Sequence, residues 1–279
     1  MKKLGFIGGS GLYSVKGVEI IDEIQVDTPF GAPSDSIFKG FTEDCEVYFL
    51  PRHGRAHHLL PSEVNYRANI FAFKKLGVDC LVSVSAVGSL EERLSPGDFF
   101  CPDQFIDWTK GKRERTFFGE GVIGHVSAAN PVDLNLRDLI VQSAESIGQE
   151  IKTDGSYICI EGPQFSTKAE SQIYRSFGAQ VIGMTNVPEA YLAKEAGMAY
   201  STIAMVTDFD CWKDVHCSVD EIMKVMKSNN QKAQALIPKI IENYSKKPIK
   251  AIKENEVGIM TPIENMSSSQ KSIIDILLS

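Results

Sequence analysis

Short apolar segments alternate along most of the chain with longer segments in which apolar residues recur every three or four positions. The first kind predicts buried strands and the second predicts amphipathic helices. The expected strands are residues 4–7, 47–50, 78–85, 157–160, 181–184 and 200–207. The expected helices are residues 62–76, 133–147, a helix that begins near 167, 188–196 and 219–244. This alternation predicts an α/β fold with a largely parallel, mixed central sheet flanked by helices.

Residues that favour helix ends support these boundaries. Pro61 and Ser62 precede the helix at 62–76, Gly77 follows it, and Thr167 with Glu170 forms a capping-box pattern. The stretch 245–264 is polar and is followed by a short amphipathic helix at about 264–279. Because no linker-like composition or fixed-period repeat interrupts the chain, we expect a single domain over residues 1–279.

Composition excludes several classes of protein. Of the 279 residues, 43% are hydrophobic and 23% are charged, which is typical of a globular protein, and the net charge of −7 argues against a nucleic-acid partner. The 6 cysteines have no metal-site spacing. No apolar segment is long enough to span a membrane, and the first residues do not resemble a signal peptide. We therefore expect a cytoplasmic protein with reduced thiols, no membrane association and no metal.

Small and hydroxyl-bearing residues follow several of the expected strands, where ligands usually bind in sheets of this kind. Gly8-Gly9-Ser10-Gly11 follows the first strand, and Ser85-Ala86-Val87-Gly88-Ser89 follows the third. Gly183-Met184-Thr185-Asn186 immediately precedes a helix, whose first N–H groups attract anions. One such loop alone is typical of an ordinary connection. Their common position at strand ends predicts a phosphate site.

A cationic cluster follows the strand at 47–50. It contains Arg52, His53, Arg55, His57 and His58. Arginine offers a rigid pair of donors to phosphate oxygens, and histidine adds another donor. A metal site and a solvated basic loop are the alternatives. The two arginines and the absence of Asp or Glu within the cluster disfavour the metal, so we favour anion binding.

Two acidic residues, Asp208 and Asp210, follow the strand at 200–207. In an extended chain they project from the same face, and two adjacent carboxylates do not ionise together easily. A carboxyl group that keeps its proton can donate to a purine ring nitrogen, while its ionised partner accepts from an amino group, as an adenine edge requires. A turn or helix cap and the metal-binding D-x-D of glycosyltransferases are the alternatives.

These residues occur within a longer series of short motifs. The chain resembles the trimeric methylthioadenosine phosphorylases of the purine nucleoside phosphorylase superfamily nearly from end to end. The motifs that carry the resemblance are Gly8-Gly9-Ser10-Gly11-Leu12, Asp27-Thr28-Pro29-Phe30-Gly31, Arg52-His53-Gly54-Arg55, Val64-Asn65-Tyr66, Pro96-Gly97-Asp98, Asp103-Gln104-Phe105-Ile106-Asp107, Glu161-Gly162-Pro163, Met184-Thr185 and Thr207-Asp208-Phe209-Asp210-Cys211-Trp212.

The resemblance implies a role for each matching position. The phosphate would be held by Ser10, Arg52, His53, Ser85, the backbone of Ala86, and Thr185. Met184 would contact the ribose. The base would be surrounded by Phe165, Ser166, Ile182, Asp208 and Asp210, with Asp208 as the proton donor to N7. The 5′-methylthio group would lie against Val219, Ile222 and Met223, and His125 would reach it from a neighbouring subunit of a homotrimer.

The expected reaction is therefore the phosphorolysis of 5′-methylthioadenosine to adenine and 5-methylthioribose 1-phosphate, with phosphate as co-substrate and no cofactor. The same residues are compatible with three alternative functions. They are a phosphorylase for 6-oxopurine nucleosides or methylthioinosine, a hydrolase that uses water, and a nucleoside-binding protein without catalysis. Asn at position 208 would suit a 6-oxopurine, so Asp208 favours adenine.

Overall fold

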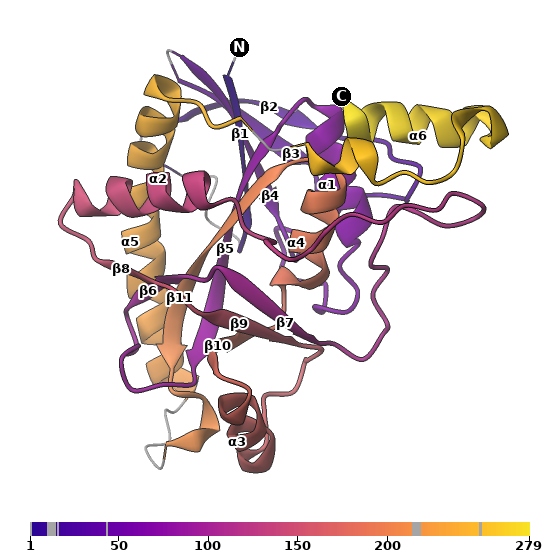
Figure 1. The fold of residues 1–279 in the computed structure, drawn as a ribbon. Coiled ribbons are helices and arrows are strands. Elements are labelled where there is room, and N and C mark those ends of the chain that lie inside the picture. Colours follow the sequence, from indigo (N-terminus) through magenta and orange to yellow (C-terminus); the bar gives the residue numbers. More distant parts are fainter. Residues whose placement is uncertain (1, 10–14, 16, 43, 214–218, 251–252) are drawn as a thin grey trace.

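A computed structural model describes residues 2–9, 15, 17–42, 44–213, 219–250 and 253–279. In that part of the chain, 11 strands form one mixed sheet (Figure 1). The strands are β1 (Lys2–Gly8), β2 (Glu19–Ile24), β3 (Ile37–Phe41), β4 (Cys45–Pro51), β5 (Cys80–Ser89), β6 (Phe99–Cys101), β7 (Gln104–Trp108), β8 (Ile151–Thr153), β9 (Ser156–Ile160), β10 (Ala179–Gly183) and β11 (Ala199–Asp208).

The sheet runs in the order β2-β3-β4-β1-β5-β10-β9-β7, and a branch of β11, β6 and β8 joins it at β5. Strands β4, β1, β5 and β11 are mutually parallel, whereas β10 is antiparallel to β5 and parallel to β9. The carboxyl ends of β1, β4, β5 and β11 therefore meet at one edge, where the sequence predicts the ligand site.

Helices cover both faces of the sheet. They are α1 (Tyr66–Lys75), α2 (Leu134–Glu145), α3 (Lys168–Ser176), α4 (Asn186–Glu195), α5 (Val219–Lys246) and α6 (Ser268–Leu278). Figure 1 shows α2 and α5 on one face and α1, α4 and α6 on the other, with α3 apart at the end of the sheet near β9 and β10. No helix in the described ranges is long and apolar enough to cross a lipid bilayer.

Alternate residues of the strands enter two cores. From β1, Leu4 and Phe6 pack with the α2–α5 side, whereas Ile7 packs with the α1–α4–α6 side. This alternation follows from the period of two along a strand. Since both faces are buried, the central strands are almost continuously apolar, which is why the sequence indicates them clearly.

The α/β fold is confirmed, and several local predictions need correction. Helix α1 begins after Asn65, whose side chain accepts from the N–H of Ala68, rather than at Ser62. Residues Ser85 to Ser89, expected as a loop, belong to β5. The capping box at Thr167 is confirmed. Strands β2, β3, β6, β7 and β8 were not predicted.

Candidate active site

A cavity of about 490 Å³ lies at the carboxyl edge of the sheet and is bounded on one side by α5. Twelve of the residues proposed from sequence line it. They are Arg52, His53, Ser85, Ala86, Phe165, Ser166, Ile182, Met184, Thr185, Asp208, Asp210 and Ile222. These residues come from four strands or the residues that follow them (β4, β5, β10 and β11), the loop after β9, the start of α4, and α5, so segments far apart in sequence build one site.

Arg52 follows β4 and lies beneath one end of the cavity. Its side chain is 2% exposed and forms an ion pair with the buried Glu189 of α4, with Nε–Oε2 and Nη2–Oε1 distances of 2.6 and 2.9 Å. Further donated bonds reach the Ser83 hydroxyl and the carbonyls of Ile7 and Val84. Burial alone would lower the pKa of Arg52, but the Glu189 carboxylate raises it above its ordinary value. Arg52 is therefore a permanent cation.

The other arginine of the cationic cluster, Arg55, lies at the surface and does not line the cavity. Arg55 donates to Asp35 and Glu23 at the surface and stacks over the Phe38 ring. Its charge is neutralised outside the cavity. The cluster that looks continuous in the sequence is thus divided, and Arg52 alone of the two arginines lines the cavity.

His53 lines the cavity beside Arg52 as a neutral imidazole. Burial and the neighbouring Arg52 charge lower its pKa to about 4. Its Nδ1 lies 2.9 Å from the carbonyl oxygen of Leu59, which accepts only, so Nδ1 carries the hydrogen. Nε2 is then an acceptor. We expected His53 to supply a donor, and the neutral ring instead offers a lone pair.

Hydroxyl groups complete this end of the cavity. The Ser85 hydroxyl, on β5, donates to Oδ1 of Asn186 over 3.2 Å. Oγ1 of Thr185, at the N-cap of α4, is buried and has no hydrogen-bond partner among the described residues. Because a buried hydroxyl without a partner is costly, it indicates that a ligand atom completes the site.

The opposite end holds the two carboxyl groups. Strand β11 ends at Asp208, and Asp210 begins a 3₁₀ turn with φ of 36°, its N–H donating to Oδ2 of Asp208 over 3.0 Å. Burial raises the pKa of both carboxyl groups, and the Asp208 charge adds to the rise at Asp210. Both carboxyl groups line the same cavity. The geometry comes from a turn rather than an extended strand, and burial outweighs mutual repulsion.

Thr207 contacts Asp208 directly. Its Oγ1 lies 3.1 Å from the carbonyl oxygen of Val87 and donates to Oδ1 of Asp208 over 2.6 Å. This bond favours the carboxylate and lowers the pKa of Asp208, but burial has the larger effect and raises it. Asp208 therefore holds its proton to a higher pH than an exposed carboxyl group does.

Gly88, on β5, lies directly beside the two carboxyl groups and faces the cavity. A Cβ at this position would come within 3.1 Å of Cγ2 of Ile182 and 3.4 Å of both Oδ2 of Asp208 and Cβ of Asp210. The absence of a side chain at position 88 therefore leaves room between β5 and β10 for a flat ligand beside the acids.

Helix α5 closes a third side through residues on one face. Ile222, Met226 and Asn230 line the cavity at intervals of four residues. Met223 is 57% exposed and does not line it, because one residue along a helix turns the side chain by about 100°. The prediction for Met223 was wrong in helical phase. Met226 and Asn230 were missed, although an i, i+4 pattern from Ile222 points to them.

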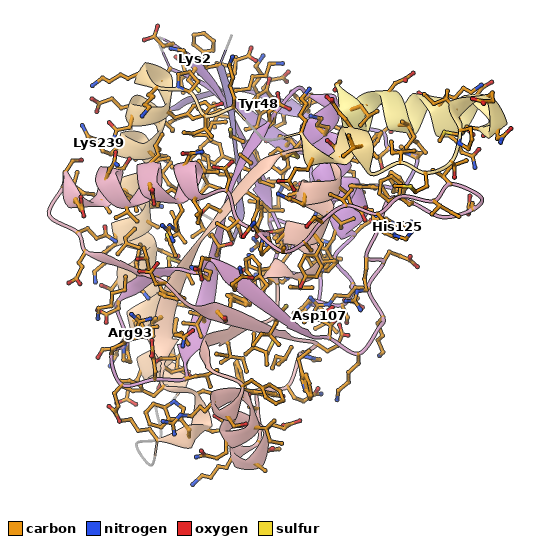
Figure 2. The ribbon with its side chains drawn as sticks, in the orientation of Figure 1. Lys2, Tyr48, Arg93, Asp107, His125 and Lys239 are labelled. Atoms are coloured by element: carbon orange, nitrogen blue, oxygen red, sulfur yellow. The ribbon has the colours of Figure 1, made fainter. Side chains whose placement is uncertain are left out.

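Three other predicted site residues need separate mention. Ser10 lies outside the described residues, and so does the side chain of Val219. His125 does not line the cavity of this chain, and its backbone N–H donates to the carbonyl oxygen of Gly258. His125 itself lies on the connection between β7 and α2 (Figure 2). Its proposed role depends on a second subunit.

Other lining residues were not named as site residues from the sequence. They are Gly9, His57, His58, Leu59, Leu60, Pro61, Val84, Val87, Gly88, Ile160, Pro163, Gly183, Met205, Thr207, Met226 and Asn230. Many directly follow or precede a predicted position, so proximity to the motifs was a usable signal. In the described ranges no group of three His, Cys, Asp or Glu side chains is placed to hold a metal ion.

The class of protein follows from a comparison with known families. A family model described as "Phosphorylase superfamily" matches residues 3–242. The chain therefore belongs to the phosphorylase superfamily.

Within it, the chain is similar to proteins named S-methyl-5'-thioadenosine phosphorylase. It is 52% identical over 236 residues to that of Geobacter sulfurreducens, which covers 84% of this chain and 82% of the relative. It is 45% identical over 284 residues to that of Thermosynechococcus vestitus, which covers 99% of this chain and 98% of the relative.

Solved structures give the same result. A methylthioadenosine phosphorylase from an antarctic soil metagenomic library superposes with a TM-score of 0.94 at 44% identity, over 100% of this chain and 99% of the other. An adenosine/methylthioadenosine phosphorylase from Schistosoma mansoni, a variant in complex with adenine, gives 0.83 at 34% identity over 100% and 98%.

Proposed function

We propose that this protein catalyses the phosphorolysis of 5′-methylthioadenosine to adenine and 5-methylthioribose 1-phosphate. The observation that carries the proposal is the half-buried carboxyl group of Asp208, whose pKa is raised and which lines the same cavity as Arg52, Ser85 and Thr185. The names of the relatives, methylthioadenosine phosphorylases from several bacteria, support the same substrate.

The base end stabilises the leaving group. Cleavage of an N-ribosidic bond leaves negative charge on the purine, and a proton at N7 removes it. Asp208 holds that proton, and the carboxylate that it leaves behind accepts from the Thr207 hydroxyl and from the N–H of Asp210. Asp210 accepts from the exocyclic amino group. Phe165, Ser166 and Ile182 surround the base, and Met184 contacts the ribose.

The phosphate end supplies and orients the nucleophile. Thr185 and Ser85 donate hydroxyl hydrogens to phosphate, the Ala86 backbone and Ser10 contribute further contacts, and Arg52 supplies positive charge from beneath. Neutral His53 accepts the hydrogen of monohydrogen phosphate through Nε2, so its lone pair selects a phosphate that still carries a proton. The phosphate charge also stabilises the cationic sugar of the transition state.

The remaining parts of the proposal concern the 5′ group and the assembly. Ile222, with Val219 and Met226, provides an apolar surface for the methylthio group. We place the enzyme in the cytoplasm as a homotrimer in which His125 of one subunit reaches the 5′ end of the next site. Inorganic phosphate is the co-substrate, and the reaction as written balances without a cofactor or a metal.

The test is adenine release from 5′-methylthioadenosine with and without phosphate, with inosine as a parallel substrate. Phosphate-dependent adenine release with inosine inert is the expected result. Release of adenine without phosphate would mean a hydrolase, and cleavage of inosine alone would overturn the roles of Asp208 and Asp210. Ligand-induced thermal stabilisation without any base release would mean a binding protein.

A further inference from the structure

Arg113 lies behind the cavity on the connection that follows β7, outside any helix or strand. Its side chain has 0% exposure and forms an ion pair with Glu161, with Nε 2.8 Å from Oε1. The second oxygen of Glu161 accepts from the N–H of Lys110, 2.8 Å away. A buried arginine that does not line the cavity needs an explanation other than substrate binding.

The shortest hydrogen bonds of Arg113 are directed at backbone carbonyls and at Glu161, while longer contacts run from Nη1 to the Tyr66 hydroxyl (3.3 Å) and the Cys159 sulfur (3.8 Å). Nη1 lies 2.8 Å from the carbonyl of Met184 and 2.7 Å from that of Val187. Nη2 lies 3.3 and 3.0 Å from the carbonyls of Ile160 and Glu161. With the Glu161 carboxylate, these are acceptors for all five N–H groups that a guanidinium carries. Arg113 therefore has no donor left for a ligand.

The four carbonyls belong to two separate walls of the cavity. Ile160 and Glu161 begin the loop that carries Phe165 and Ser166, here called the base wall (residues 160–166). Met184 and Val187 flank Thr185 at the start of α4, here called the ribose wall (residues 184–187). One planar guanidinium binds both walls, so their separation is set by a rigid group rather than by two flexible side chains.

We propose that Arg113 is a positioning residue that fixes the distance between the base wall and the ribose wall. The inference rests on the proposed function, in which a nucleoside spans both walls. Of these two walls, adenine contacts only the base wall and phosphate contacts only the ribose wall; their other contacts come from residues outside both walls. Loss of Arg113 therefore impairs the reaction of the joined nucleoside far more than the binding of either half.

Two substitutions separate the charge of Arg113 from its shape. Arg113→Lys keeps a cation for Glu161 but has three N–H groups, too few for both walls. Arg113→Met removes every donor. Lys74→Met is the matched control, because Lys74 is also a buried cation, paired with Asp79 over 2.7 Å, and does not line the cavity. Its loss destabilises the fold without moving either wall.

The measurements are kcat and KM for 5′-methylthioadenosine, the adenine Kd by calorimetry, and Tm. A misplacement of the reacting groups by about 1 Å costs roughly 100-fold in rate, so kcat/KM should fall by about that factor in Arg113→Met and by about tenfold in Arg113→Lys. The adenine Kd should change little. Lys74→Met should lower Tm and leave kcat and KM unchanged.

Two results would overturn the inference. In the first, both Arg113 variants have a lower Tm than the wild type but the same kcat and KM, which is what a purely structural role predicts. The other is an adenine Kd weakened as much as kcat/KM, which would mean that the base wall itself has collapsed. Should Arg113→Met fail to fold, Arg113→Lys carries the same comparison.

Failure of the proposed function gives a different signature. In that case the wild type releases no adenine in the presence of phosphate. The Arg113 inference is then tested by binding alone, with tubercidin as a nucleoside that lacks N7 and adenine as the free base. Arg113→Lys should weaken tubercidin binding much more than adenine binding, and equal effects on the two would reject it.

Discussion

The two ends of the cavity differ in whether the charged side chain has a partner of opposite charge. At the phosphate end, Arg52 is buried against Glu189, so both groups keep their charge. At the base end, Asp208 and Asp210 are half-buried and form no ion pair with another described residue, and burial raises their pKa. The same physical cost, removal of a charge from water, is compensated at one end and left uncompensated at the other. One end therefore supplies a fixed charge and the other supplies a proton.

The largest expected effect comes from removal of that proton. In Asp208→Asn the side chain can still form a hydrogen bond but cannot transfer a proton, so kcat for 5′-methylthioadenosine should fall by about 10²–10⁴-fold. The KM for phosphate, measured in the same assays, should stay near the wild-type value. Asp98→Asn, at a carboxylate outside the cavity, is the control. Equal, modest losses in kcat and phosphate affinity would contradict the division between the two ends.

The second-largest effect is expected when Arg52 at the phosphate end loses the carboxylate that compensates its charge. Glu189→Gln leaves Arg52 as a buried cation without its partner, so the free energy of unfolding should fall by about 3–5 kcal/mol, and the phosphate KM should rise. Denaturant unfolding and initial rates measure the two. Arg55→Gln breaks the surface ion pairs with Asp35 and Glu23 and should cost far less, because solvent screens exposed pairs. Similar losses in both variants would refute the contrast.

The pH dependence should differ between the two ends. Because burial raises the pKa of Asp208, its proton is present below that pKa and is lost as the pH rises through it, so kcat/KM should fall on the alkaline side. Protonated Asp208 also contributes to the free energy of unfolding, and this contribution is lost as the pH rises through the same pKa. His53, with a pKa of about 4, should cause no transition above pH 5. An alkaline limb that persists unchanged in Asp208→Asn would assign it to another group.

The smallest predicted effect concerns one hydroxyl. Thr185→Val preserves the shape of the side chain and removes its donor, so the phosphate KM should rise by a factor that corresponds to about 0.5–1.5 kcal/mol, or roughly 2- to 10-fold. Thr185→Ser keeps the donor and should stay close to the wild type. A phosphate KM that is the same in both variants would show that Oγ1 of Thr185 does not reach the phosphate.

The sequence predicted those parts of the site whose signal is local. Arg52, Thr185 and Asp208 each stand at the end of an apolar strand, and the common edge of a parallel sheet brings strand ends together. Helix α5 gave a partial result. The apolar pattern located the helix, but the resemblance assigned Met223 to the site, whereas Met226 lines the cavity.

The supporting residues had no such signal. Glu189 is one of two acidic residues in its helix and lies 137 positions from Arg52. Arg113 stands in a stretch without periodicity, 71 positions from Met184. The short strand β2 is polar and mostly exposed, so it lacks the apolar run that indicates a central strand. Long-range pairs of this kind depend on the three-dimensional fold, which local patterns do not contain.

Gly88 restricts the routes by which the substrate range of this enzyme can change during evolution. A methyl group at position 88 would lie 3.1 Å from Cγ2 of Ile182 and 3.4 Å from both acids, so even the simplest substitution, Gly88→Ala, narrows the base site. A change of specificity toward another nucleobase is therefore expected to come from substitutions at positions 208 and 210, which alter hydrogen bonding without filling the cavity. A lineage that adopts a new base is expected to retain glycine at 88 while its acids diverge.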